Sequence, residues 1–215
     1  MAGEASLALS GPGRKVKLFD MSAPDSDPPK PRRNPTGQSV GPSVYKVPPG
    51  DDRERLVCAE CGFIHYENPK IVVGSVIEHE GRVVLCRRAI HPRRGYWTLP
   101  AGYLESRETV TDGAKREALE EACAEIEVGD LFAVYNIPRL SQVHLFFRAR
   151  LLKEAVACGP ESLEVRLFAW DAIPEADLAF PTTRWALKHY REVAGERAFA
   201  VRTNPPGDWG DLVRS

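Results

Sequence analysis

The chain has 215 residues, of which 43% are hydrophobic and 27% are charged, and its formal net charge is −1. A nearly neutral chain is not strongly attracted to nucleic acids or anionic lipids, so we expect neither as a partner. The sequence contains no apolar run near the roughly 18 residues of a membrane-spanning helix, and its start lacks the features of a secretory signal. We therefore expect a cytoplasmic protein, and its five cysteines, an odd number, argue against a disulfide framework.

The N-terminal segment differs in composition from the rest of the chain. Nine of the 18 prolines lie in the first 50 residues, which hold few large apolar side chains. Such a segment cannot bury enough apolar surface to offset the entropy that is lost on ordering. We therefore predict that residues 1–45 form a disordered leader, whose role stays open.

The first predicted elements after the leader are strands. Two β-branched apolar runs at 71–78 and 82–88 flank a turn at 79–81 and predict a hairpin. A short strand is predicted next, at 96–99.

Helices and further strands follow. Thr109 and Asp112 resemble a capping box, which predicts a helix from Val110 to Ala122. The remaining predicted elements are strands at 131–137, 142–152 and 163–170 and a second helix at 182–194. This order predicts an α/β domain with a mixed sheet between helices.

The predicted helix at 110–122 carries an unusual concentration of acidic residues, in REALEE. On a helix that turns about 100° per residue, Glu117, Glu120 and Glu121 share one face about 100° wide. Like charges this close destabilise an isolated helix by roughly a few tenths of a kcal/mol per pair, and no lysine lies on that face. A solvated acidic face and a site for a hard divalent cation are the two interpretations of this cluster.

The residues upstream favour the cation site. Gly102, Glu108 and Arg116 precede the other glutamates at spacings that give the pattern G-x5-E-x7-R-E-x2-E-E. Six fixed residues at background frequencies match by chance at roughly one in ten million starting points. The pattern matches the Nudix box, and the chain resembles a Nudix hydrolase.

This resemblance implies a fold and a chemistry. The fold is an α/β/α sandwich with a mixed sheet, in which the box forms a loop, a helix and a second loop. The chemistry is hydrolysis of a nucleoside diphosphate linked to another moiety, with Mg²⁺ or Mn²⁺ as the cofactor. By position, the resemblance also implies metal ligands at Glu117, Glu120 and Glu121, a bracing salt bridge between Arg116 and Glu108, and a close backbone turn at Gly102.

The box departs from the family pattern at its end. The family usually has a glycine that ends the helix, and this chain has Cys123 in that place. We expect the helix to continue by one or two residues there, and every charged position of the box is intact.

Other candidate site residues lie outside the box pattern. A further carboxylate from a loop often serves as general base in similar proteins, and Glu164 is our candidate, whereas Glu161 is interpreted as a surface residue. Glu105, inside the box loop, stays open between a metal-site residue and a surface residue. Arg139 lies in a predicted loop after the box, where we expect it to contact a substrate phosphate.

Cys58 and Cys61 form a C-x2-C pair followed by glycine, the pattern of a zinc knuckle. The arrangement resembles the Nudix subgroup with a zinc ribbon before the hydrolase domain, which includes NADH pyrophosphatases and a plant plastid enzyme that splits FAD and ADP-ribose. A structural zinc needs four ligands, residues 1–57 contain neither cysteine nor histidine, and His65 adds at most a third. We therefore predict a decayed ribbon-like segment without structural zinc.

These observations divide the chain into segments and reduce the set of candidate substrates. After the leader we assign the ribbon-like segment to residues 46–66, a Nudix hydrolase domain to 67–195 and a C-terminal tail to 196–215. The tract SQPWPFP, typical of NADH pyrophosphatases, is absent after the box, so we expect FAD, ADP-ribose or a similar ADP-containing compound as substrate. A Nudix-like module that binds ADP-ribose without cleaving it is the alternative function. The oligomeric state stays open, and a homodimer is one state that the resemblance implies.

Overall fold

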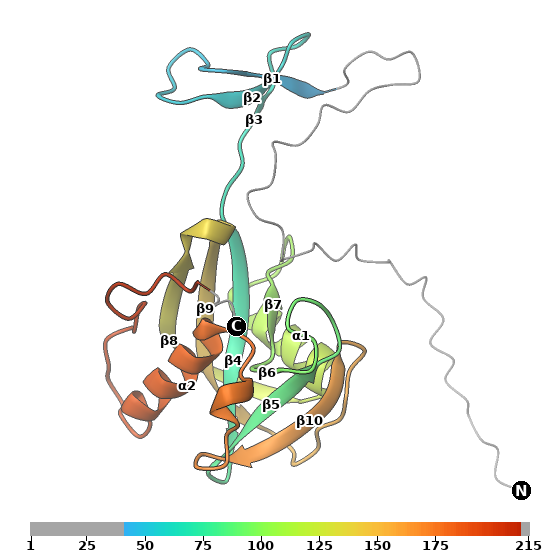
Figure 1. Cartoon of the computed structure of the whole chain (residues 1–215), viewed down its shortest axis with the longest axis vertical. Helices are drawn as coiled ribbons and strands as arrows, with labels where there is room; N and C mark the ends of the chain where they lie inside the picture. Colours follow the sequence, from blue (N-terminus) through green and yellow to red (C-terminus); the bar gives the residue numbers. More distant parts are fainter. Residues whose placement is uncertain (1–40, 212–215) are drawn as a thin grey trace, which may run out of the picture.

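The structure is a computed structural model that describes residues 41–211. No helix in this part of the chain is long and apolar enough to cross a membrane. The elements labelled in Figure 1 are β1 (Pro42–Lys46), β2 (Arg55–Cys58), β3 (Ile64–His65), β4 (Lys70–His79), β5 (Arg82–Arg88), β6 (Trp97–Thr98), β7 (Ala101–Tyr103), α1 (Val110–Ala122), β8 (Ile126–Ile137), β9 (Gln142–Leu151), β10 (Ser162–Ala169) and α2 (Pro181–Val193). Two short 3-10 helices span Pro138–Leu140 and Glu175–Asp177.

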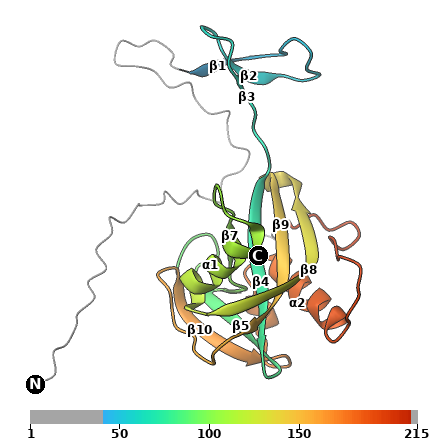
Figure 2. The same ribbon diagram turned by 180° about the vertical axis from the view of Figure 1, so that it is seen from behind.

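A seven-stranded mixed sheet forms the centre of the fold. Its main order is β10-β5-β4-β9-β8, with β6 paired to β5 and β7 paired to β4. β4 and β9 run parallel, and the other pairs in this sheet run antiparallel. The two long helices pack against separate apolar clusters of the sheet. Figures 1 and 2 show the helices and the sheet from opposite sides. This arrangement is the α/β/α sandwich expected from the sequence.

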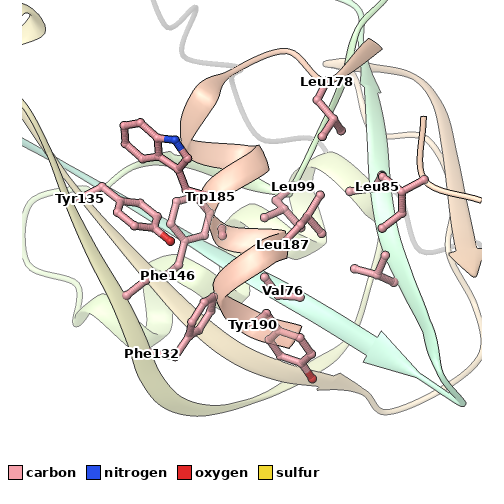
Figure 3. Close-up of a cluster of buried hydrophobic side chains, with 14 of the residues drawn as sticks. Val76, Leu85, Leu99, Phe132, Tyr135, Phe146, Leu178, Trp185, Leu187 and Tyr190 are labelled. Carbon is pink, nitrogen blue, oxygen red and sulfur yellow. The ribbon is translucent and has the colours of Figure 1, made fainter. Parts of the chain in front are cut away.

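The two faces of the sheet carry different cores. The core under α2 is rich in aromatic side chains, which Figure 3 shows converging between the helix and the strands: Phe132, Tyr135, Phe146, Trp185 and Tyr190. The core under α1 is built from smaller residues, with Ala118 and Ala122 of the helix against strands β4 and β5. A Cβ at Gly113 would lie 2.9 Å from Val73 Cγ2, so α1 lies close to the sheet. This closeness brings the polar edge of the helix to β7.

Most predicted elements are confirmed to within a few residues. The first helix has the predicted bounds, and Thr109 Oγ1 accepts a hydrogen bond from the Asp112 N–H at 3.1 Å. The hairpin turn lies at Glu80 and Gly81, whose φ angles of 49° and 73° match a tight two-residue turn. β8 begins at Ile126 rather than at residue 131. Its pairing with β9 continues across register shifts between Val128 and Ala133, so the strand includes residues before the predicted start.

The expectation that the first helix continues beyond Ala122 is wrong. Cys123 adopts the left-handed conformation, with φ of 49° and ψ of 29°, and its N–H donates to Leu119 O at 3.0 Å. The Ala124 N–H donates to Ala118 O at 3.1 Å, which completes the pattern that usually ends in glycine. Cysteine therefore occupies a conformation in which its Cβ is crowded.

Cys123→Gly is expected to raise the free energy of unfolding by about 1 kcal/mol, because glycine adopts the left-handed conformation without a crowded Cβ. Urea unfolding followed by circular dichroism measures the change. Cys158→Gly is the matched control, since Cys158 is also exposed but does not have a positive φ, and it should not stabilise the protein. A gain at both positions, or a loss at 123, would contradict this explanation.

A second, three-stranded antiparallel sheet is made of β1, β2 and β3, and it lies apart from the large sheet in Figures 1 and 2. β1 begins at Pro42, inside the predicted disordered leader 1–45. The prediction of disorder does not hold for residues 42–45, because pairing with β2 orders a segment whose composition gives no sign of it. Residues 1–40 of the predicted leader lie outside the described residues.

The described part of the segment after α2, residues 196–211 of the tail assigned above, packs against the large sheet; residues 212–215 lie outside the described residues. The Arg202 N–H donates to Phe132 O at 2.8 Å, and the Val134 N–H donates to Arg202 O at 2.9 Å, so this segment pairs with the edge strand β8. Gly210 is buried, and a Cβ there would lie 2.6 Å from Ile137 Cδ1. The C-terminal segment therefore covers the edge of the sheet and leaves no room for a side chain at position 210.

Candidate active site

The three glutamates of α1 lie where the helix meets the edge of the sheet. Ala118 and Ala122 are fully buried against the sheet and fix the orientation of the helix. Glu117 and Glu121 lie beside this apolar stripe and are buried, whereas Glu120 is exposed. The acidic face predicted from the helical period is therefore real, but it divides into two buried carboxyl groups and one that faces solvent.

Arg116 connects most of the acidic residues of the box. Its Nε and Nη2 donate to the two carboxylate oxygens of Glu108 at 3.0 and 2.7 Å. Its Nη1 donates to Glu117 Oε1 at 2.7 Å and to Glu120 Oε2 at 2.9 Å, and Nη2 also donates to Tyr103 O at 2.9 Å. All five N–H groups of the guanidinium are used, so the expected salt bridge with Glu108 is present as one part of a larger network.

Strand β7 holds the two buried glutamates. A Cβ on Gly102 would lie 2.5 Å from Glu117 Cδ, so any side chain there would displace the carboxylate. The Ala101 N–H donates to Glu121 Oε2 at 3.0 Å. β7 thus makes room for one glutamate and binds the other.

The two buried carboxyl groups are short of positive charge. Burial raises the pKa of Glu117 to about 7, although the Arg116 guanidinium opposes this shift. Burial raises the pKa of Glu121 to about 8, against the Ala101 N–H and together with the charge of Glu117. By contrast, Arg116 holds the pKa of Glu108 below its usual value.

The chemistry of this cluster fits a hard divalent cation. Three carboxyl groups of the box, those of Glu108, Glu117 and Glu120, share the single guanidinium of Arg116, and Glu121 accepts from a backbone N–H instead. Hydrogen bonds engage one oxygen each of Glu117, Glu120 and Glu121, and among residues 41–211 none engages the second oxygen. Carboxylate oxygens are the ligands that Mg²⁺ prefers, so the donor chemistry of these three residues suits Mg²⁺ or Mn²⁺, while their oxygens do not all lie within 4.8 Å of one another in the described part of the chain.

The structure distinguishes the two glutamates near β10. Glu164 lies in the strand, and its carboxylate forms an ion pair with Arg166 at 2.8 Å. Glu161 precedes the strand and is exposed. Burial is the main cause that raises the pKa of Glu117 and Glu121, and the negative charge of Glu161 raises both pKa values further. Glu161, and not Glu164, is therefore the residue whose charge acts on the two buried glutamates, and its side chain is exposed, as the sequence analysis expected.

A pocket lies on the α2 side of the sheet, against β7. Ala101 and Gly102 line it, and these residues also contact the acidic cluster or leave space for it. The other lining residues come from the strands, the loop after β8, the start of α2 and the C-terminal segment: Val72, Arg88, Pro92, Thr98, Tyr103, Ile137, Arg139, Leu140, Gln142, His144, Phe146, Phe180, Pro181, Thr182, Thr183 and Gly210. The strand β7 is thus the partition between the pocket and the acidic helix.

Arg88 is a pocket residue that the sequence analysis missed. It is buried, its Nε donates to Pro92 O at 2.9 Å, and its guanidinium lies 5.0 Å from the centre of the Phe180 ring. Burial lowers its pKa, while Glu121 and Glu161 oppose this shift. An arginine at the end of an apolar strand gives no signal of burial, because such positions usually face solvent.

Two other candidate residues have different surroundings. Arg139 lines the pocket, and its Nε donates to Asp211 Oδ1 at 3.2 Å, so the C-terminal segment holds it. Glu105 has an exposed side chain, and it contributes to the box through its backbone N–H, which donates to Glu108 Oε1 at 2.6 Å.

His144 is expected to make the protein less stable in acid. Burial lowers its pKa to about 4 from an ordinary value of 6.5, so between these pH values the unfolded state binds more protons than the folded state. Its contribution to stability is complete above pH 6.5 and is lost as the pH falls toward 4. Over the interval from pH 7 to pH 5 this loss is about 2 kcal/mol.

The measurement is urea unfolding at pH 7 and pH 5. His144→Asn, which does not titrate, should lose about 2 kcal/mol less than the wild type over this interval. His65→Asn is the control, because His65 is exposed on the small sheet. An equal loss in the wild type and in His144→Asn would contradict the assignment.

The cysteine pair forms a closed turn in the small sheet. The Cys58 N–H donates to Phe63 O at 2.8 Å, and the Gly62 N–H donates to Cys58 O at 3.0 Å. Backbone hydrogen bonds, first from Cys61, lower the pKa of the Cys58 thiol. In the described part of the chain, the one group of three or more His, Cys, Asp or Glu side chains whose ligand atoms all lie within 4.8 Å of one another is His79, Glu80 and Glu154, so neither cysteine belongs to such a group. The expected lack of structural zinc stays a prediction.

Comparison with known families agrees with this geometry. The NUDIX domain family matches residues 68–191, which is more than half of the chain, and the Nudix N-terminal zinc-ribbon family matches residues 40–67. The chain belongs to the Nudix family. This membership confirms the resemblance, the fold and the hydrolase class that the box predicted.

Three Nudix proteins that are similar to this chain show its relationships within the family. It is 47% identical to a NUDIX hydrolase from Nitrosomonas europaea of known crystal structure, with a TM-score of 0.71 over 78% of this chain and 93% of that one. It is 29% identical over 119 residues to the ADP-ribose pyrophosphatase of Methanocaldococcus jannaschii, covering 54% of this chain and 69% of that protein. It is 28% identical over 200 residues to the human 8-oxo-dGDP phosphatase NUDT18, covering 91% of this chain and 50% of the human protein.

Proposed function

We propose that this Nudix protein uses Mg²⁺ or Mn²⁺ to hydrolyse the pyrophosphate bond of an ADP-containing compound such as ADP-ribose or FAD. The observation that supports this most is the acidic cluster of α1, short of positive charge, which lies across β7 from a pocket. The M. jannaschii relative, named an ADP-ribose pyrophosphatase, supports the same substrate class. The nearly neutral charge of the chain supports a small-molecule substrate over a nucleic acid, and the location that we propose is the cytoplasm.

The residues of the site have separate tasks in this reaction. Glu117, Glu120 and Glu121 would hold the metal, which when bound neutralises phosphate charge and acidifies a water molecule. Arg116 restrains the carboxylates in single rotamers by its hydrogen bonds. Arg88, buried in the pocket wall, offers terminal N–H groups to a phosphate oxygen, because only its Nε is bound among residues 41–211.

Glu161 is the better candidate than Glu164 for accepting a proton from the attacking water. Glu161→Gln is expected to lower kcat by about 100-fold or more, because loss of a general base typically costs 10²–10⁴ in rate. Glu164→Gln is the matched control and should retain activity within about threefold, since this carboxylate is paired with Arg166. The opposite result, with activity lost only in Glu164→Gln, would restore the assignment made from the sequence.

The function is tested with a panel of substrates. The purified protein is incubated with Mg²⁺ or Mn²⁺ and ADP-ribose, FAD, NADH, coenzyme A, nucleotide sugars and 8-oxo-dGDP, and the products are separated by chromatography. We expect AMP from ADP-ribose or FAD in the presence of metal and none in the presence of EDTA. Hydrolysis of 8-oxo-dGDP alone, the substrate named for the human relative, would replace the ADP-containing class.

A module that binds ADP-ribose without cleaving it is the alternative function. Its expected result is tight ADP-ribose binding by a protein that is inert on the whole panel. The presence of all three glutamates beside a single guanidinium argues for catalysis, because a module that only binds ADP-ribose has no need of a set of carboxylates that suits a divalent cation.

A further inference from the structure

Alternation along the strands places three polar side chains on one wall of the pocket. Val72 of β4 pairs with Tyr103 of β7 on one side and with His144 of β9 on the other. Paired residues point to the same face of a sheet, and Gln142, two residues before His144, shares that face. All four residues line the pocket.

Gln142 connects the two other polar residues through both ends of its amide. Its Nε2 donates to Tyr103 Oη at 2.8 Å, and its Oε1 lies 2.9 Å from His144 Nε2. An amide oxygen only accepts hydrogen bonds, so His144 Nε2 carries the hydrogen. Gln142 is only 5% exposed, so both ends of its amide are bound by protein groups in place of water.

This direction of hydrogen bonding leaves one unbound group on Tyr103 and one on His144, at the two ends of the hydrogen-bonded series, for a ligand. His144 carries its hydrogen on Nε2, so Nδ1 is an acceptor, and burial keeps the ring neutral at physiological pH. Tyr103 Oη already accepts from Gln142, so its own hydrogen remains to be donated. Across residues 41–211 no hydrogen bond engages either group, and a ligand that satisfied both would gain affinity.

We propose that this wall binds the adenine ring of the substrate, with the 6-amino group donating to His144 Nδ1 and N1 accepting from Tyr103 Oη. Adenine carries a donor beside an acceptor on one edge, which complements an acceptor and a donor held at the two ends of one amide. Apolar side chains of the same pocket, Val72, Leu140 and Phe146, provide surfaces for a planar ring. The inference rests on the proposed function and assigns the residues that select the base.

The test measures equilibrium binding, which does not require turnover. Isothermal titration calorimetry compares AMP with purine riboside 5′-monophosphate, which lacks the 6-amino group, and with 1-deaza-AMP, which lacks N1. In the wild type we expect each analogue to bind about tenfold more weakly, because each leaves one buried polar group without a partner. In His144→Phe the penalty for losing the amino group should disappear while that for losing N1 remains, and Tyr103→Phe should show the reverse.

Each outcome decides for or against this assignment. Equal binding of AMP and both analogues by the wild type, or no binding of AMP, would overturn it without the use of any variant. Loss of the amino-group preference in Tyr103→Phe rather than in His144→Phe would show the opposite hydrogen-bond direction and would also overturn it. Hydrolysis of ADP-ribose is followed in parallel, so that hydrolysis together with equal analogue binding removes this inference and leaves the proposed function standing.

Discussion

Glu120→Gln is expected to lower kcat/KM for the best substrate of the panel by about 100-fold or more while the protein stays folded. Glutamine keeps the length of the side chain and an oxygen that accepts from Arg116, but it removes the negative charge that a divalent cation needs. The Glu120 side chain is 57% exposed, so the fold does not depend on its burial. The loss should therefore appear in activity and not in the unfolding midpoint.

Two further measurements give this prediction its controls. Glu125→Gln, just beyond the helix, changes an exposed glutamate that pairs with Lys153 and should leave activity within about twofold. Titration of Mg²⁺ should show that Glu120→Gln needs a higher metal concentration than the wild type. Unchanged activity and metal requirement in Glu120→Gln would remove Glu120 from the metal site.

The local part of the site could be predicted from the sequence because it depends on spacing alone. The helix bounds follow from the cap at Thr109, and the helical period puts the three glutamates on one side of α1. Which of them are buried depends on how α1 meets β7, a three-residue strand after Pro100 that no periodicity could reveal. The buried state of Glu117 and Glu121 was therefore beyond the reach of the sequence.

The remaining residues of the site depend on contacts between distant segments. Glu161 and Glu164 are three residues apart, and only the pairing of β10 with β5 decides which of the two charges acts on the buried glutamates. Arg88 was missed for the same reason, since its burial depends on Phe180 from the start of α2. The C-terminal segment reaches the pocket at Gly210 through pairing with β8, and nothing in its composition indicates that edge.

Arg116→Lys is expected to reduce both stability and activity. Lysine carries the same charge but cannot make the paired hydrogen bonds to Glu108 and at the same time reach Glu117, Glu120 and Tyr103 O. We expect the free energy of unfolding to fall by about 2 kcal/mol, because partly buried charge-assisted hydrogen bonds are lost. For a chain of this size that change lowers Tm by about 4–8 °C.

The activity loss should be about 10–100-fold, because the carboxylates keep their charge but lose the contacts that restrain them. Assays at 15–20 °C, about 25 °C or more below a typical mesophilic Tm, keep the variant folded and separate positioning from unfolding. Arg197→Lys is the control, since Arg197 is exposed and makes none of these contacts. If Arg116→Lys kept full activity and only its Tm fell, the guanidinium would serve the fold alone. Glu117 and Glu121, two of the proposed metal ligands, would then hold their positions through β7, by the space at Gly102 and the hydrogen bond from Ala101.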